Sequence, residues 1–274
     1  MYPEISLGPF TVHTFGLMMA LAFVAAGIVA YFEFRRKGLD PEKIYWLVIA
    51  SALGGLIGAK VNYLLLNLDQ VKADPLSTIF SGAGLVWYGG LIGGLLAALL
   101  VMRLYRLPWA KVLDAGAPAM AIGYAFGRMG CFLNGDDYGR PSTLPWAVQF
   151  PKGSPPTPSG VSVQPTELYE AFSSLVILAI VLWLRPRLKR DWAMICLYLT
   201  LAGFERFMVE FVRFHNGEMP GVTRQGQLQQ QLLGLATAVV AGIAFLWVQL
   251  RKQRQPELEE AERAPVTKPA TDAS

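Results

Sequence analysis

Seven apolar segments, each long enough to cross a lipid bilayer, constrain the fold of this chain more than any other feature. A transmembrane helix needs about 18 or more predominantly apolar residues. The 274 residues are 53% hydrophobic and 16% charged, and seven runs reach this length: 14–34, 45–66, 84–104, 113–133, 167–185, 193–213 and 229–250. These runs lack the alternation of barrel strands, and a segment in lipid must satisfy its own backbone hydrogen bonds. We therefore predict an all-α, polytopic membrane protein with seven transmembrane helices.

The lysine and arginine residues predict how this helical domain lies in the membrane. Cytoplasmic loops are enriched in these residues, and 16 of the 24 lie in or beside the connections after the first, third, fifth and seventh runs. The opposite connections hold four. We therefore expect an outward N-terminus and a cytoplasmic C-terminus. The net charge of +4 is then mainly a topology signal, and we expect no nucleic acid as a partner.

Two segments outside the apolar runs complete the predicted organisation. Residues 134–166 contain seven prolines, which exclude regular helix and indicate either an ordered outward cap or a flexible loop. Residues 251–274 are charged and end in Pro, Thr and Ala, so we expect a disordered cytoplasmic tail. The predicted transmembrane domain is thus 1–250, with its outward head at about 134–166.

Small residues predict close helix packing between the second and third runs. The pentamer GGLIG occurs at 54–58 and again at 89–93, and glycines four apart allow two helices to approach closely. A duplicated half of a transporter would leave a similar trace. Cys131 and Cys196 are expected near opposite ends of the bundle, too far apart for a disulfide, so we predict two thiols.

Ionisable residues inside the apolar runs are the strongest indication of function. Each costs at least about 2.5 kcal/mol at membrane depth, so several together are expected to face a polar cavity or one another. In GFERFMVEFVRFH, Arg206, Glu210 and Arg213 are spaced to share one helix face, where Glu210 can bridge the two arginines. The alternative is an ion-pair ladder that only holds helices together.

Three further residues near the outer ends of the runs are candidates for binding. Glu170, in PTELYE, lies one turn into the fifth run and is placed to pair with a cation from another helix. Lys60 precedes Tyr63 by three residues near the outer end of the second run. This lysine is either part of the site or extends toward the lipid head groups.

The stretch GRMGCFLNGDDYGRP, residues 127–141, combines charged, amide and glycine residues at the end of an apolar run. Arg128 is expected about one turn below the outer surface, while Asn134, Asp136 and Arg140 lie at or beyond it. This is the depth of lipid phosphates. An arginine offers a planar fork to phosphate oxygens, and glycines permit close backbone approach to a ligand. We therefore predict a functional site here.

This stretch resembles the signature of the bacterial prolipoprotein diacylglyceryl transferase family. The resemblance covers most of residues 5–250 and includes LGPFTVHTFGLM, YGGLIGG, PTELYE, RFMVEFVR and the GQ at 226–227. It implies a seven-helix enzyme of the bacterial inner membrane with an outward head. Such enzymes move the diacylglyceryl group of phosphatidylglycerol to the lipobox cysteine of a prolipoprotein, forming a thioether and releasing glycerol 1-phosphate. The implied partners are phosphatidylglycerol, prolipoprotein signal peptides and membrane lipid, with no metal or organic cofactor.

The resemblance also implies roles for individual residues. Arg128 and Arg206 match the essential arginines of the family and are expected to hold the leaving phosphate. Asn134, Asp136 and Gly139 are expected to shape the head-group pocket. The other candidate binding residues are Lys60, Tyr63, Arg140, Glu170, Glu210 and Arg213.

Several positions depart from the family pattern and leave the general base open. The departures are Phe15 for tyrosine, Tyr88 for histidine, Cys131 for asparagine, Asp136 for glutamate and Gln164 for histidine. Tyr88 replaces the proposed base, and a phenol with a pKa near 10 is a poor base unless its surroundings shift it. His13, Asp136, Glu170 or the field of the arginines are the other routes to a thiolate.

Two other functions fit some of these features. A paralogue that binds phosphatidylglycerol without transferring its diacylglyceryl group would explain the substitutions at Tyr88 and Gln164. A small transporter would also carry charges inside the membrane and a repeated glycine motif, but it accounts less well for arginines at head-group level and for a proline-rich cap.

Overall fold

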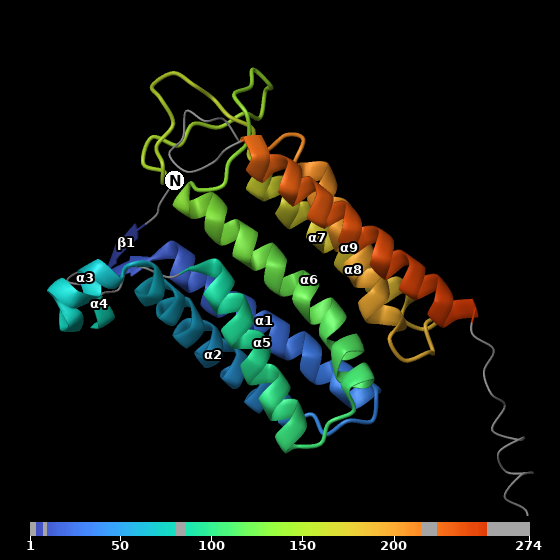
Figure 1. The fold of residues 1–274 in the computed structure, drawn as a ribbon. Helices are drawn as coiled ribbons and strands as arrows, with labels where there is room; N and C mark the ends of the chain where they lie inside the picture. Colours follow the sequence, from blue (N-terminus) through green and yellow to red (C-terminus); the bar gives the residue numbers. More distant parts are fainter. Residues whose placement is uncertain (1–3, 8–9, 81–85, 215–223, 251–274) are drawn as a thin grey trace, which may run out of the picture.

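Long helices packed side by side form the body of the molecule (Figure 1). The computed structural model describes residues 4–7, 10–80, 86–214 and 224–250. Within these ranges, the long helices coincide with the seven apolar runs, which confirms a predominantly helical chain. They are α1 (Thr14–Arg36), α2 (Lys43–Leu66), α5 (Trp87–Leu104), α6 (Trp109–Asn134), α7 (Thr166–Leu184), α8 (Ala193–Val209) and α9 (Arg224–Leu250).

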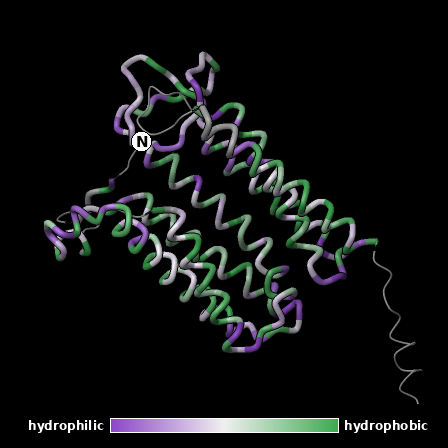
Figure 2. The backbone as a smooth tube through the Cα atoms, viewed as in Figure 1, coloured by the Kyte–Doolittle hydropathy of each residue, from purple (hydrophilic) through white to green (hydrophobic). Residues whose placement is uncertain are grey.

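The surface of the helices is suited to lipid. By length and composition, α1, α2, α7 and the Gln230–Leu250 part of α9 are each able to cross a membrane. Along these helices, large apolar side chains such as Phe32 and Val240 are more than half exposed. Figure 2 shows hydrophobic residues mainly along the helices and hydrophilic residues mainly in the segments at their ends. Such extensive apolar exposure indicates a membrane protein.

Four short elements in the described part of the chain were not predicted from the apolar runs. Strands β1 (Glu4–Leu7) and β2 (Phe10–His13) pair antiparallel, with Glu4 opposite His13. Two six-residue helices, α3 (Leu68–Ala73) and α4 (Pro75–Phe80), follow α2. This pair of strands departs from the all-α prediction. Its Phe, Thr and Val residues in β2 favour a strand, and the segment is too short and polar to have registered as a span.

The helices pack in a few close pairs, of which α2 with α5 is held by glycine (Figure 1). A methyl group added to Gly58 would collide with the carbonyl oxygen of Gly89, and one added to Gly93 would collide with that of Gly54. Only glycine permits two helix backbones to approach this closely. The predicted packing role of the GGLIG repeats is therefore confirmed.

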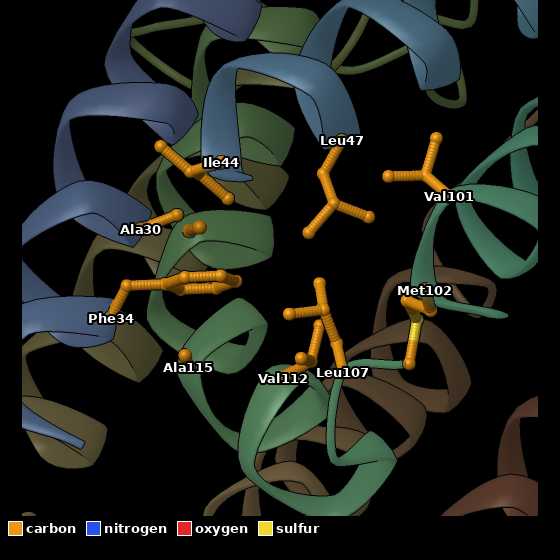
Figure 3. Close-up of a cluster of buried hydrophobic side chains, with 10 residues drawn as sticks. Ala30, Phe34, Ile44, Leu47, Val101, Met102, Leu107, Val112 and Ala115 are labelled. Carbon is orange, nitrogen blue, oxygen red and sulfur yellow. The ribbon is translucent and has the colours of Figure 1, made fainter. Parts of the chain in front are cut away.

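The two ends of the bundle differ in composition. The connections that follow α1, α5 and α7 gather at one end, and the segment between α6 and α7 lies at the other (Figure 1). We refer to these as the basic end and the cap end. Near the basic end, apolar side chains from four helices converge on Phe34, which is 1% exposed (Figure 3). The labelled neighbours in this core are Ala30, Ile44, Leu47, Val101, Met102, Leu107, Val112 and Ala115.

Beside this core, buried carboxylates join the helices at the basic end. Glu33 of α1 is 1% exposed. Its two oxygens pair with Arg36 Nη2 at 2.7 Å and with Arg185 Nη1, just after α7, at 2.6 Å. Asp114 of α6 is fully buried and pairs with Lys37 Nζ at 2.9 Å. We call these five residues the basic-end cluster, which the sequence analysis did not predict.

Candidate functional site

The segment between α6 and α7, residues 135–165, is ordered and has a small core of its own. Phe150 is fully buried, and Tyr138 stacks on it with ring centroids 5.3 Å apart. Val163 pairs with both Pro141 and Val148 in isolated bridges. The sequence left open whether the proline-rich segment is an ordered cap or a flexible loop. Its buried aromatic core and its bridges correspond to an ordered cap.

Gly139 fixes the cap to the end of α8. Its N–H donates to the Gln164 carbonyl at 2.8 Å, and it forms an isolated bridge with Arg213. A methyl group added to Gly139 would lie 2.7 Å from Thr166 Cγ2 and 2.7 Å from the Val212 carbonyl oxygen. Real side chains do not tolerate such distances, so a glycine is required for the backbone to pass between these residues.

The sixth predicted run extends further than its helix. Helix α8 ends at Val209 rather than at residue 213. Arg213 therefore lies beyond the helix, in the bridge with Gly139, and the prediction of three charged residues on one helix face is wrong for Arg213. The contact with the cap determines where the Arg213 side chain lies. Helical spacing along the sequence cannot predict such a contact.

Glu170 of α7 is the centre of a cluster of ion pairs beneath the cap. Its side chain is fully buried. The carboxylate pairs with Arg128 Nε at 3.2 Å, with Arg206 Nη1 at 3.2 Å and with Arg213 Nη1 at 3.7 Å. The Tyr124 hydroxyl donates to the same group at 2.9 Å. The expectation that Glu170 pairs with cations from other helices is confirmed.

Two further carboxylates complete this cluster. Asp137 of the cap pairs with Arg128 Nη1 at 2.9 Å through one oxygen and with Arg213 Nη2 through the other. Glu210 pairs with Arg206 Nη2 at 3.0 Å. The arrangement is a set of arginines from three chain segments held by carboxylates. The cap-end cluster consists of Arg128, Asp137, Glu170, Arg206, Glu210 and Arg213.

A cavity of about 430 Å³ lies against this cluster. Polar groups of Arg128, Asp137, Arg206 and Arg213 line one part of it, and apolar residues of α8 and α9, including Leu199 and Leu233, line another. Arg128 and Arg206 therefore share one hollow. Guanidinium groups beside an apolar wall provide an anion site for a molecule that also has an apolar part.

The comparisons with known proteins show the family to which this chain belongs. A family model described as prolipoprotein diacylglyceryl transferase matches residues 4–248. The chain belongs to the prolipoprotein diacylglyceryl transferase family.

Its relatives in this family cover nearly the whole chain. The chain is similar to a phosphatidylglycerol–prolipoprotein diacylglyceryl transferase of Chromohalobacter salexigens, at 35% identity over 265 residues, which are 93% of this chain and 95% of the relative. The protein of that name in Coxiella burnetii is 33% identical over 264 residues, 92% and 99% of the two chains. The one in Clostridium tetani is 29% identical over 242 residues, 88% and 95%.

The other candidate residues of this family member are spread around the cavity rather than all lining it. Tyr88 of α5 lines the cavity, and Gln230 Nε2 of α9 donates to its hydroxyl at 3.5 Å. His13 is 73% exposed in its side chain and pairs with Glu4 at 3.5 Å. Among the described residues, the cavity lining does not include His13. The structure thus separates two of the candidate bases in space.

Five candidate residues lie near the C-terminal ends of α2 and α6 or in the cap. The Lys60 ammonium lies 5.3 Å from the centre of the Tyr63 ring. Asn134 Nδ2 donates to Asp136 at 2.7 Å. Arg140 is exposed, and its Nε donates to the Arg213 carbonyl at 3.4 Å. None of these residues is part of the cavity lining formed by the described segments.

Sequence reasoning missed two residues of the site, Tyr124 and Asp137. Tyr124 lies one helical turn before Arg128, whose guanidinium carbon is 5.0 Å from the centre of the Tyr124 ring. A spacing of four residues in one helix places both side chains on the same face, so this signal was available. Asp137 was missed because the resemblance gave a role to its neighbour Asp136, which stands at a glutamate position of the family, and gave none to Asp137.

The two cap aspartates have opposite electrostatic surroundings. Burial raises the pKa of Asp136, and the hydrogen bond from Asn134 offsets only part of this effect. Burial also acts against ionisation of Asp137, but the positive charges of Arg213 and Arg128 outweigh it and lower its pKa to about 2. Because this pKa lies below the usual value, the stabilisation from ionised Asp137 is present above about pH 4 and is lost as the pH falls toward 2. Asp137 is therefore an anion in any physiological condition.

Proposed function

We propose that this protein transfers the diacylglyceryl group of phosphatidylglycerol to the lipobox cysteine of a prolipoprotein, and that the cap-end cluster is its active site. The observation that carries this proposal is the convergence of Arg128, Arg206 and Arg213 on one cavity. The cavity offers guanidinium groups for the phosphate and an apolar wall for the glyceryl part of the lipid. Membership in the family supports this reaction, and the arginine-lined cavity supports the proposed location of the active site.

The proposed reaction is a displacement at carbon. The cysteine sulfur attacks the glyceryl CH2 that carries the phosphate, so a C–S bond forms as the C–O bond breaks. The bonding electron pair stays on the phosphate oxygen, and glycerol 1-phosphate leaves. Charge therefore develops on the phosphate, where Arg128 and Arg206 donate hydrogen bonds. Donors fixed before the reaction stabilise such charge strongly at a site of low dielectric.

The thiol must lose its proton before or during this attack. A cysteine thiol has a pKa of about 8.5, and nearby cations lower it. We propose that the field of the arginines lowers the pKa of the thiol so that its proton passes to water, and that the Tyr88 hydroxyl, which also lines the cavity, donates a hydrogen bond to the resulting thiolate. Glu170 is already engaged by three arginines and Tyr124, so its proposed role is to position the arginines.

The remaining candidates are proposed to form the approach to this site. Asn134, Asp136 and Gly139 shape the cap above the arginines. Arg140 supports the backbone of Arg213. Lys60 and Tyr63, at the end of α2, are proposed to contact lipid head groups beside the entrance.

We also propose that all seven long helices cross the bacterial inner membrane, with the N-terminus and the cap outside and the C-terminus in the cytoplasm. The basic connections after α1, α5 and α7 gather at one end of the bundle (Figure 1), as the positive-inside rule requires. The cap-end cluster then lies at the depth of the outer phosphates.

The decisive experiment uses the purified full-length protein with phosphatidylglycerol and a lipobox peptide. We expect a diacylglyceryl mass increment on the peptide cysteine and an equal amount of released glycerol 1-phosphate. A peptide with serine in place of cysteine is the matched control and should gain no mass. Lipid binding without any increment on the cysteine peptide would contradict transfer and favour a protein that only binds the lipid.

A further inference from the structure

Asp137 occupies the position between two arginines that an anionic ligand would take. Its carboxylate bridges Arg128 Nη1, at 2.9 Å, and Arg213 Nη2, one oxygen to each. A phosphate group offers the same pair of oxygens at a similar separation. The same carboxylate also lines the cavity. We call the position between Arg128 and Arg213 the arginine seat. In this structure the Asp137 carboxylate occupies the arginine seat.

Glu170 and Asp137 contact the same two arginines but differ in exposure. The Glu170 side chain is completely buried, whereas 45% of the Asp137 side chain is exposed. Glu170 lies behind the arginines and is enclosed by helices. Asp137 is among the residues that line the cavity, and Glu170 is not. Of these two carboxylates, Asp137 is the one that can be displaced into solvent without burying an unpaired charge.

The formal charges of the cap-end cluster are compatible with replacement of the Asp137 carboxylate by a phosphodiester. Its ion pairs join three arginines with three carboxylates, so the cluster is neutral when Asp137 is in place. Removing Asp137 from the seat leaves one positive charge. A phosphodiester carries a single negative charge and would restore neutrality. One carboxylate exchanged for one phosphodiester thus keeps the buried site balanced, which avoids the cost of an uncompensated charge.

The backbone at Asp137 is anchored, so only the side chain has to move. Its φ of 63° is in the left-handed region, which aspartate and asparagine adopt more readily than most residues. The Thr166 hydroxyl donates to the Asp137 carbonyl at 2.8 Å. The cap can therefore remain in position while the carboxylate rotates away from the arginines.

We propose that Asp137 is an internal counter-ion that yields the arginine seat to a phosphate group and returns to it when the phosphate leaves. The proposal deepens the proposed function, because it concerns the same site and the same leaving group. Asp137 lowers the affinity of the free site for phosphate and limits inhibition by the released product. It thereby determines how strongly the pocket holds a phosphate, whether this belongs to a lipid or to glycerol 1-phosphate.

The test is the affinity of the full-length protein for phosphate in detergent at low ionic strength. In Asp137→Asn, we expect inorganic phosphate and glycerol 1-phosphate each to bind about tenfold more tightly, because a like charge a few ångströms away is removed. Asparagine also suits the left-handed backbone. Asp191→Asn, an exposed aspartate between α7 and α8, removes the same charge elsewhere and should change either affinity by less than about twofold, given this screening.

A second arm distinguishes the lipid from the free product. Binding to nanodiscs with phosphatidylglycerol is compared with binding to nanodiscs without it. If the lipid and the soluble phosphates bind at the same place, Asp137→Asn should increase the affinity for phosphatidylglycerol by about the same factor as for glycerol 1-phosphate. A gain for glycerol 1-phosphate alone would confine the exchange to product release. Unchanged or weaker phosphate binding in a folded Asp137→Asn protein would overturn the proposal and assign Asp137 to holding the arginines in place.

Arg128→Ala separates this inference from the function on which it rests. If this variant loses phosphate binding while Asp137→Asn has no effect, the arginine pocket stands and only the counter-ion role fails. If Arg128→Ala binds phosphate like the unmodified protein, the pocket is no phosphate site, and both ideas fail. A structural defect can weaken binding but does not produce the tighter binding expected of Asp137→Asn.

Discussion

The two ends of the helix bundle each contain a cluster of ion pairs with buried carboxylates, and the clusters differ in which of their charged side chains are exposed. At the basic end, the carboxylates of Glu33 and Asp114 are buried, at 2% and 0% side-chain exposure, while Arg36 and Arg185 are about one third exposed. At the cap end, the arginines are 10–25% exposed and lie behind an aspartate that is 45% exposed.

This difference separates a structural cluster from one suited to chemistry. The basic-end carboxylates are held by cations and, for Asp114, by the backbone N–H of Ile195 at 3.0 Å. Arg36 and Arg185, the two cations of Glu33, are partly exposed, as basic residues near helix ends commonly are, whereas Lys37 is 12% exposed. The cap-end arginines instead face a cavity and carry an accessible counter-ion. An anion that replaces this counter-ion gains two preformed guanidinium contacts.

The largest expected effect is the loss of transfer after removal of a cap-end arginine. Arg128→Ala or Arg206→Ala should lower the rate of diacylglyceryl transfer by about a thousandfold, because charge on the leaving phosphate loses a fixed donor. Peptide mass increments measured over time give this rate. Arg187→Ala, at an exposed arginine of the basic end, is the control and should keep the normal rate. Full activity in either cap-end variant would remove the distinction between the two clusters.

The next effect should appear in stability rather than in activity. Lys37→Met leaves the fully buried Asp114 without its cation, which should lower the free energy of unfolding by about 3 kcal/mol. Thermal unfolding in detergent measures it. Transfer per folded molecule should change little, since Lys37 is remote from the cavity. Lys43→Met breaks the exposed pair with Asp40 and should cost less than about 1 kcal/mol. Equal losses in the two variants would show that burial at the basic end is unimportant.

A smaller effect tests how the cap directs Arg213. Gly139→Ala should destabilise the protein by about 1–3 kcal/mol, because the added methyl group overlaps Thr166 and the Val212 carbonyl. It should also reduce transfer, since Arg213 follows this contact. Gly127→Ala is a matched control in α6 where the methyl group has no neighbour within 4 Å, and it should be neutral or slightly stabilising. If both alanines behave alike in unfolding and transfer assays, the close approach at Gly139 does not position the arginine.

The smallest effect concerns the position where the family typically has histidine. Tyr88→His should keep the transfer rate or raise it a few fold, because an imidazole with a pKa near 6.5 accepts a proton more readily than a phenol at neutral pH. Tyr88→Phe should lower it a few fold if the hydroxyl assists the arginine field. The rates are measured across pH 6–9. A large loss in Tyr88→His would mean that the cavity depends on the phenol itself.

Much of the fold was predictable because a helix in lipid depends mainly on its own sequence and not on its neighbours. Each apolar run satisfies its own backbone hydrogen bonds, so its length and composition predicted a helix without knowledge of its neighbours. The glycine pentamers likewise predicted the α2–α5 packing, since absence of a side chain is a property of the residue alone. The pairing of β1 with β2 was not predicted in this way, because a short strand is stable only with its partner.

The candidate site was predictable in part. Charges at membrane depth identified Arg128, Arg206 and Glu170, since their energetic cost is visible in the sequence. Motif similarity directed attention to Asp136, whereas Asp137 is the aspartate that contacts the arginines. Neighbouring residues in a turn point in different directions, and the left-handed backbone at Asp137 decides which one faces the cluster.

The sequence by itself thus determined which segments are long helices. It also determined which charged side chains must pair or face a cavity, because their transfer into lipid costs free energy. The tertiary structure decided where each charge found its partner, including the end of α8 at Val209 and the return of Arg213 to the cap. The reason is that these interactions act over different separations along the chain. Backbone hydrogen bonding and hydrophobicity act within a segment, whereas an ion pair between helices exists only once distant segments have packed against each other.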